Sequence, residues 1–533
     1  MMRQQKILRV CLGVLLLLNV SDLLAEDSAE EKGAVVTTDA VYCQSSDERQ
    51  HCPANTTSGV ILQNSTGSAA CLLGNTWGYD DKGVWVEGGC SGDFLVGKAE
   101  PIGELESATT STAPEFDGQQ TWQNTWGSYS PGKGVSLFKG KGGEVSLSAY
   151  ALLRYMNQMP ADQTFTDHLG NEHPVNARHD IYSHRVIVWL SGWAADPKLV
   201  YNIAWWTVNT TDQDALFGNI GYQFDKKFNL YAGINGNPGS RSMFGSHPYW
   251  LGNDRVMADE FFRPFFTQGL WANGEVLPGF WYSVMVGNTS STLGVTASQL
   301  DRKFTTGGSL WWMPTTHEFG PRGGYGDWEN HQKLATRFGI STVNSPEQRY
   351  TEIGTDPGNT SLKLADSLNL FSTGALAPGT TVTFADYRIL SLDAGFKYKG
   401  FFFQAEYYHR WLDGFEASGV LPVDEIVDDG FYIQTAFFPV PKKIELYFAT
   451  SQIYGDKDAG FSDSNEYLVG MNYYPWNTRN HRLNVQVIDV NRSPVNSTFG
   501  YYTGGQDGTT VSVAFSIFSV SYTHLTLPTI PFE

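Results

Sequence analysis

The chain has 533 residues, which is too long for one ordinary hydrophobic core, so it forms either several domains or one large barrel. Its formal net charge is −19 at pH 7, and this acidic balance argues against a nucleic-acid-binding protein, which needs a basic surface. Aromatic residues make up 14% of the chain, as expected if aromatic side chains ring both ends of a membrane barrel.

Residues 1–25 have the features of a secretory signal peptide. Three basic residues precede an apolar stretch at 10–20, and Ala25 is a suitable cleavage residue. A membrane-anchoring helix is disfavoured because the apolar stretch is short and Asp22 follows it. The rest of the sequence contains no apolar run of about 18 residues, so any insertion into a membrane must use strands.

We expect residues 26–96 to form a small exported module that disulfides hold together. Four cysteines lie in this stretch, namely Cys43, Cys52, Cys71 and Cys90. An even set in so small an exported module predicts two disulfides, which offset a small core. The sequence leaves three pairings open. A metal site is disfavoured because the spacings are wide and no Cys-x-x-Cys occurs.

The run 71–80, with 83–86 and the Gly-Cys pair that follows, resembles a small four-cysteine module of secreted bacterial proteins whose function is unknown. This resemblance implies export but no chemistry. We place the module in the periplasm, where peptidoglycan is a candidate partner. Its aromatic residues form either a face that stacks on sugars or a miniature aromatic core: Trp77, Tyr79 and Trp85. Residues 97–142 are rich in Gly, Ser, Thr and Pro, and we interpret them as a linker.

Residues 143–520 hold about sixteen short segments in which every second residue is apolar. A strand turns alternate side chains to opposite faces, so each segment has one apolar and one polar face. We therefore predict an all-β fold, a 16-stranded antiparallel transmembrane β-barrel with lipid outside and water inside. The predicted strands begin near residues 144, 184, 199, 215, 228, 263, 277, 303, 331, 383, 401, 430, 443, 465, 482 and 509.

The connections between these strands alternate between long and short, as in bacterial outer-membrane barrels. An even strand count places both chain ends on the periplasmic side. A soluble β-sandwich or propeller does not explain this alternation, nor the aromatic residues that gather at strand ends. One short connection breaks the rule, because 314–330 is long and rich in Gly. The long connections are 158–183, 237–262, 343–382, 413–429 and 491–508.

Four motifs resemble the phosphate-selective porins of Gram-negative outer membranes, the porin O/P family. They lie at 154–158, 185–198, 254–264 and 326–331, and the resemblance covers about 130–520. It implies a barrel that is often a homotrimer, with a long loop folded into the lumen. It does not imply phosphate selectivity, because the arginine ladder and lysine cluster on which selectivity depends cannot be matched residue by residue.

The alternation within the strands assigns charged residues to the lumen, where they would bias which ions enter. Alternatively, these residues pair with one another and brace the barrel wall. The basic ones are Arg154, Arg185, Lys333, Arg337, Lys397 and Arg410, and the acidic ones are Asp393, Glu406 and Glu445.

The loop 237–262 is the predicted constriction of the pore. It lies between the fifth and sixth strands and carries charges of both signs, which would set a transverse field opposite a basic wall. Alternatively, these charges form a salt-bridged latch that fixes the loop to the wall. They are Arg241, Asp254, Arg255, Asp259 and Glu260, followed by Arg263.

Catalysis and metal binding find little support in the sequence. It has no Gly-x-Ser-x-Gly, no phosphate-binding Gly-rich loop and no His-Glu-x-x-His, so we expect neither an enzyme nor a cofactor. Four histidines lie in or beside the first long connection, and a solvated loop explains them better than a metal site. They are His168, His173, His179 and His184.

Residues 521–533 break the alternation and resemble translated sequencing-adapter read-through, so we interpret them as a non-native tail. The sequence as a whole predicts a passive outer-membrane porin, surrounded by lipid, for small hydrophilic solutes or ions. A preference for anions or phosphate stays open. The alternative is a cell-wall or glycan-binding protein that the barrel anchors.

Overall fold

A computed structural model of the chain describes two compact units, separated between Ala113 and Pro114. The predicted signal peptide, most of the predicted linker and the predicted tail lie outside the described residues. Those are 38–54, 56, 60–69, 71, 76–80, 82–97, 134–208, 213–244, 249–291, 295, 299–300, 303–320, 324–497 and 500–519.

The first unit contains two small antiparallel sheets. One sheet has the strand order β1 (Thr38–Gln44), β6 (Ser91–Gly97), β3 (Val60–Ser65), and the other β2 (Gln50–Cys52), β5 (Gly83–Val86), β4 (Trp77–Asp80). Disulfides join Cys43 to Cys52 and Cys71 to Cys90, which resolves the three open pairings. Cys43, Cys90 and Phe94 have no exposed surface, so the disulfides form part of the small core that they stabilise.

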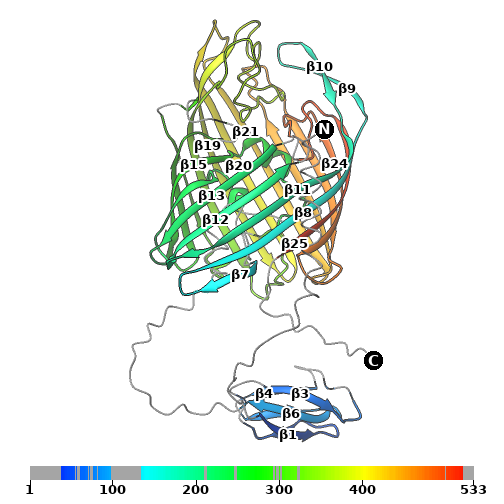
Figure 1. Cartoon of the computed structure of the whole chain (residues 1–533). Helices are drawn as coiled ribbons and strands as arrows, with labels where there is room; N and C mark the ends of the chain where they lie inside the picture. The colour runs from blue at the N-terminus through cyan, green and yellow to red at the C-terminus, as the bar shows by residue number, and fades with distance from the viewer. Residues whose placement is uncertain are drawn as a thin grey trace, which may run out of the picture. The chain divides into compact units, whose positions relative to one another are not determined.

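The second unit is a closed antiparallel barrel of sixteen strands (Figure 1). The predicted strand positions agree with it closely. The strands are β8 (Gly143–Met159), β11 (His179–Ala194), β12 (Asp196–Val208), β13 (Gln213–Gln223), β14 (Asn229–Gly236), β15 (Phe266–Leu277), β16 (Phe280–Gly287), β17 (Thr305–Trp312), β18 (Ala335–Gln348), β19 (Val382–Tyr398), β20 (Phe401–Ala417), β21 (Ile426–Val440), β22 (Ile444–Tyr454), β23 (Ser464–Tyr473), β24 (His481–Asn491) and β25 (Gly508–Ser519).

The barrel closes where its first and last strands pair, from Met159 opposite Thr509 to Ala149 opposite Ser519. A further short strand, β7 (Val135–Gly140), pairs with the start of β8. The interpretation of 97–142 as a linker throughout is therefore wrong at its end. The Gly-Lys-Gly turn at 140–142 sends the chain back antiparallel, so β7 gains a partner for its backbone groups.

Side chains alternate between the two faces of the barrel wall as the sequence predicts. In β8, Leu153 is 53% exposed on the outer face, whereas Arg154 is completely buried inside. The outer face is apolar on strands all around the barrel, for example at Leu216 in β13 and Val469 in β23. None of the helices among the described residues is long and apolar enough to cross a membrane.

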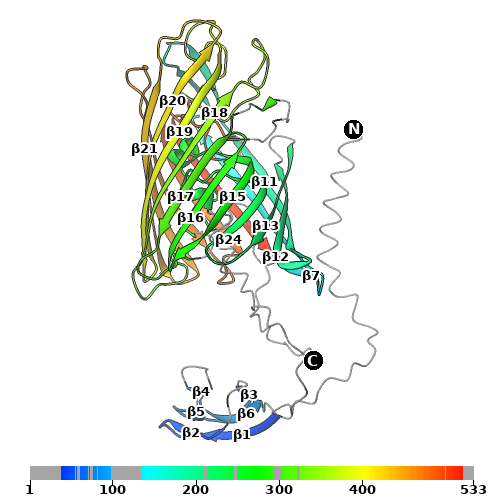
Figure 2. The ribbon, with the colours of Figure 1, turned by 90° about the vertical axis from the view of Figure 1, so that its left-hand side faces the viewer.

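The strands differ in length around the barrel. β8, β19 and β20 each have 17 residues, whereas β14, β16 and β17 each have eight. Figure 2 shows β15, β16, β17 and β18 in sequence around the wall. Three of the four strands β14–β17 are therefore short, whereas β15 between them has 12 residues.

Candidate functional site

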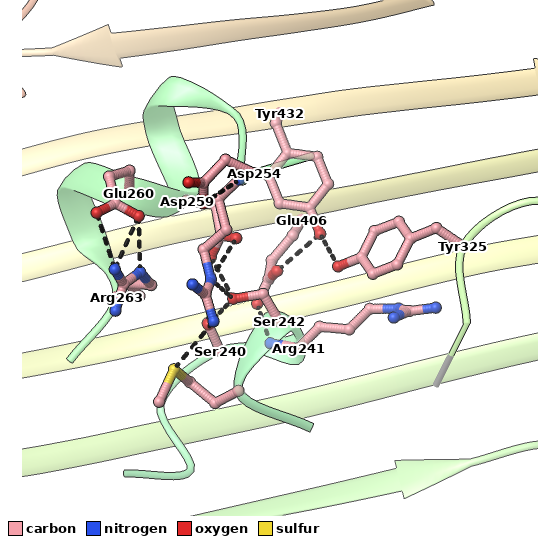
Figure 3. A network of polar contacts seen from close by, with 12 residues as sticks. Ser240, Arg241, Ser242, Asp254, Asp259, Glu260, Arg263, Tyr325, Glu406 and Tyr432 are labelled. Carbon is pink, nitrogen blue, oxygen red and sulfur yellow. Dashed lines mark hydrogen bonds and ion pairs between the residues drawn. The ribbon is translucent and has the colours of Figure 1, made fainter. Parts of the chain in front are cut away.

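Residues 237–265 connect β14 to β15, and their described parts, 237–244 and 249–265, fold into the barrel (Figure 3). They contain a 3-10 helix, η2 (Arg241–Phe244), and a short α-helix, α3 (Met257–Phe262), and every residue of both is buried. Helix α3 has no side-chain cap at Val256. Its Met257 N–H donates instead to Glu466 Oε2 of β23 at 2.9 Å. A side chain of the barrel wall thus accepts from a backbone N–H that has no partner within the helix.

Arg241 fixes η2 to the wall strand β20. Its backbone N–H donates to Glu406 Oε1 at 2.9 Å, and its Nε donates to Gln404 Oε1 at 2.6 Å. The guanidinium also lies 4.3 Å from the centre of the Tyr325 ring, a cation–π distance. Arg241 therefore joins three segments that are far apart in the sequence.

Asp259 of α3 lies at the centre of the polar network in Figure 3. Its Oδ1 accepts hydrogen bonds from Ser242 Oγ at 2.9 Å and from Tyr408 Oη at 3.2 Å. Its Oδ2 is 3.5 Å from Nε of Arg255. Tyr408 Oη also lies 2.9 Å from Glu406 Oε2, so two buried carboxylates compete for its one hydroxyl proton.

Other predicted charges form ion pairs within the loop, between the loop and the wall, or within the wall. Arg263 pairs with Glu260 at 2.8 Å inside the loop. Arg185 of β11 pairs with Asp254 at 2.8 Å and so joins wall to loop. Within the wall, Arg337 pairs with Asp393 at 2.9 Å and Arg410 with Asp428 at 2.5 Å. The pair between Arg185 and Asp254 is the kind of contact that the latch alternative predicts, and a role of the same charges in limiting the pore stays a prediction.

Fourteen of the fifteen predicted charged residues are in the interior and are buried, with relative exposures of 8% or less. Arg154 lies over the ring of Tyr501 at 5.2 Å. The placement of Lys333 on a strand facing the lumen is wrong. Lys333 precedes the start of β18 at Ala335, and its side chain is exposed in the turn. The strand begins later than predicted, so the alternation does not extend to this residue.

The sequence did not single out Arg482 of β24, which holds the loop from the strand next to β23. Its Nη1 donates to the carbonyl of Trp250 at 2.5 Å, and its Nη2 donates to Gly252 O at 3.1 Å and Asn253 Oδ1 at 2.9 Å. Arg482 adjoins the outward-facing Leu483, so the alternation within the strand would have placed it inside.

A second segment, 313–334, enters the barrel from the other end with its described parts, 313–320 and 324–334. It connects β17 to β18 at the end where the other turns are short. Phe319 and Tyr325 are 2% and 4% exposed, and the Tyr325 N–H donates to Tyr249 O at 2.7 Å. The sequence marked this segment by its unusual length, its Gly content and the motif at 326–331, but none of these signals predicts that it folds inward. The two in-folded segments, 237–265 and 313–334, thus meet inside the barrel.

His331 anchors the segment 313–334 at its end. Its Nε2 is 2.7 Å from Glu318 Oε1, and its Nδ1 contacts Asp327. Asp327 also accepts from the Gly400 N–H at 2.7 Å, which ties the segment to the turn between β19 and β20. Burial disfavours the charged imidazole, but the hydrogen bonds to both carboxylates outweigh it and raise the pKa of His331 to about 9.

Ligand atoms of Asp327, Glu329 and His331 lie within 4.8 Å of one another, which is compact enough for a metal ion. However, both imidazole nitrogens already face carboxylates. Glu329 also lies near two cations, Lys397 and Arg479. Metal ligands must be deprotonated, so this cluster fits an ion-pair network better than a metal centre.

The four histidines near the first long connection do not come together among the described atoms. His168 Nδ1 lies 2.7 Å from Asp366 Oδ2, and His173 Nε2 lies 2.8 Å from Asp167 Oδ2. His179 Nε2 lies 3.3 Å from Tyr155 Oη, and the side chain of His184 lies outside the described atoms. His168 instead joins the hairpin of β9 (Asp162–Thr166) and β10 (Glu172–Asn176) to another loop.

The aromatic residues of the first unit favour the miniature core over a sugar-stacking face. Trp77 is 6% exposed and lies 4.9 Å from Phe94, centroid to centroid. Arg49 covers the ring of Trp85 at 3.9 Å. Tyr79 is 44% exposed, so of the three candidates it is the one whose ring is open to solvent.

The family model described as a protein of unknown function (DUF3011) matches residues 32–117, which include the four cysteines of the first unit. No curated protein sequence matches the chain.

Among solved structures, the barrel is similar to outer-membrane-expressed OmpT of Vibrio cholerae, with 12% identity, a TM-score of 0.44, and coverage of 72% of this chain and 99% of that one. An anion-selective porin from Comamonas acidovorans has 11% identity, a TM-score of 0.42 and coverage of 71% and 99%. The outer membrane channel DcaP of Acinetobacter baumannii has 12% identity, a TM-score of 0.41 and coverage of 72% and 99%. These are likenesses of fold alone.

Proposed function

We propose that this protein is an outer-membrane porin that lets small hydrophilic solutes or ions diffuse passively. The observation that carries the proposal is the contrast between the two faces of the closed barrel. The outer face is apolar and exposed, as at Leu153 and Val469, whereas the inner face holds buried charges such as Arg154 and Lys397. A barrel with lipid outside and a polar path inside needs this contrast.

The two in-folded segments decide how the channel conducts. They fill the interior around Arg241 and Tyr325, where the described side chains are almost completely buried. Conduction therefore requires the segments to shift apart. Ion pairs, hydrogen bonds and a cluster of buried apolar side chains, among them Leu251, Phe261 and Phe319, hold the segments in place, so all three kinds of contact must loosen before ions pass.

Ion preference is a finer part of the proposal. Acidic side chains are as numerous as basic ones among the buried charged residues, with eleven of each. A balanced interior favours no strong preference for either sign, so any anion preference must come from a local site.

The short strands β14, β16 and β17 support a homotrimer. A strand needs about 9–11 residues to cross the hydrocarbon region of a bilayer, and β14, β16 and β17 have eight each. A second copy packed against these strands would cover them, so that lipid would not have to adapt to strands shorter than the hydrocarbon region. The mass of the protein–detergent complex, measured by light scattering, should correspond to three chains.

The alternative, a glycan-binding protein anchored by the barrel, has weaker support because Trp77 is buried and Trp85 is covered. Pull-down of the full chain by purified peptidoglycan, lost on Tyr79→Ala, would favour it.

Swelling of proteoliposomes tests the porin proposal. We expect vesicles with the full chain to swell in solutions of small sugars, faster for monosaccharides than for trisaccharides. Swelling no faster than in protein-free vesicles would contradict the proposal.

A further inference from the structure

Two buried cations surround one carboxylate at the end of the barrel where the segment 313–334 enters. Lys397 lies near the end of β19, and Arg479 lies in the turn that follows β23. Lys397 Nζ is 3.8 Å and Arg479 Nη2 is 4.0 Å from the same oxygen, Oε2 of Glu329. Both distances allow an ion pair but exceed the length of a hydrogen bond.

Each cation keeps a donor that no described residue satisfies. Lys397 is completely buried, and its Nζ makes no hydrogen bond to the described part of the chain. Arg479 is 5% exposed, and its Nε has no partner there either, although its Nη2 donates to Tyr325 O at 3.2 Å. Buried donors without partners are costly, so the site is built to hold more negative charge than it has.

The surroundings of these cations suit a small anion. Aromatic rings border the site, with Phe319 4.9 Å from Lys397 Nζ and Trp328 5.5 Å from the Arg479 guanidinium carbon. A Cβ at Gly320 would lie only 2.8 Å from Lys397 Nζ, so glycine keeps this side of the cation open. The Glu329 side chain is 29% exposed, so solvent reaches the site.

We propose that Lys397 and Arg479 form a binding site for the carboxylate group of a small solute, and that Glu329 occupies this site in the present structure. The chemistry follows from the occupant, because the group that already lies between the two cations is a carboxylate on a two-carbon stem. A free carboxylate can approach both donors more closely than Glu329, whose backbone is fixed in the segment 313–334. In the membrane, a solute reaches this site only if the barrel is a channel, so the binding role rests on the proposed function.

Propionate is the matching probe, because it reproduces the end of a glutamate side chain. We would titrate it into the full chain in detergent micelles at constant ionic strength and follow binding by saturation-transfer NMR. Lys397→Gln and Arg479→Gln should each weaken binding by about tenfold, since each removes a charged donor. Glu329→Gln should strengthen binding by about tenfold, because the amide competes less well for the cations.

Lys226→Gln is the control, since Lys226 is 70% exposed in a turn at the same end of the barrel and should leave propionate binding unchanged. Equal binding by the wild type and Lys397→Gln, or no gain in Glu329→Gln, would overturn the site. Glu329→Gln removes no buried cation, so this variant still tests the site if Lys397→Gln and Arg479→Gln fail to fold. Binding is measured without a membrane, so it is independent of conduction. If the protein binds propionate but does not conduct ions, the channel proposal is refuted and the binding site is not.

Discussion

The backbone N–H of Tyr325 donates a 2.7 Å hydrogen bond to the carbonyl oxygen of Tyr249, and the two residues belong to segments that enter the barrel from opposite ends. Arg241 of η2 lies over the Tyr325 ring, with its guanidinium carbon 4.3 Å from the ring centre. The two insertions thus contact each other inside the barrel, in addition to the contacts that each makes with the wall.

The ion pair between Arg185 and Asp254 joins β11 to the loop 237–265, and both side chains are at most 6% exposed. Arg185→Ala leaves the Asp254 carboxylate buried without this partner, so we expect a loss of about 3–5 kcal/mol in the free energy of unfolding. Urea unfolding in lipid vesicles measures the change. The double variant with Asp254→Ala should recover part of the loss.

The matched control for this pair is Arg388 with Asp413, whose side chains are 47% and 23% exposed. Arg388→Ala should cost about 0–1 kcal/mol, because water screens an exposed pair. Equal losses in the buried and exposed variants would show that Arg185 does not hold the loop.

His331 makes the stability of the protein depend on pH in the alkaline range. Its pKa is raised to about 9 in the folded protein, above its value of about 6.5 in an unfolded chain. The stability that this pairing contributes is therefore fully present below about pH 6.5 and is lost as the pH rises through about 9. Melting temperatures between pH 6 and 10 should fall more in the wild type than in His331→Gln, and parallel curves would refute the assignment.

The pair Arg255 and Asp259 braces α3 within the loop, with 3.5 Å between Nε and Oδ2, and Asp259 also contacts Tyr408 of the wall strand β20. Replacing both residues with alanine should loosen α3 and raise the single-channel conductance. Lys457 and Asp463 form an exposed pair on a connecting loop, and the same double substitution there should change nothing. Unchanged conductance in the Arg255→Ala, Asp259→Ala variant would count against a pore-limiting role for the loop.

The disulfides should matter for the first unit and not for the barrel. Cys43 and Cys90 are completely buried in its small core, so reduction removes both cross-links and part of the packing around them. Loss of a native disulfide from a small domain costs about 2–5 kcal/mol. After reduction, trypsin should cleave the 38–97 region and leave the barrel intact, whereas resistance of both units would contradict this.

The strands of the barrel were predictable because each one faces two different environments. Alternation along a strand places Leu153 outside and Arg154 inside without any knowledge of neighbouring strands. The same rule located the interior charges, and it fails only where a strand edge was misjudged, as at Lys333.

The interior contacts were not predictable in the same way. Segment 313–334 has no periodic pattern, and its path depends on partners such as Tyr249 and Gly400 that are distant in the sequence. The choice between pore-lining charges and a latch likewise depends on which residues meet across the barrel. Arg185 finds Asp254 only once the loop is folded inward.

The most direct test of the account is the ion conductance of the purified full chain in a planar lipid bilayer. We predict discrete conductance steps in the wild type, and larger steps when residues 315–332 are replaced by a two-residue turn that leaves β17 and β18 intact. A bilayer that stays silent with both proteins, although both insert, would contradict the proposal that this barrel is a channel.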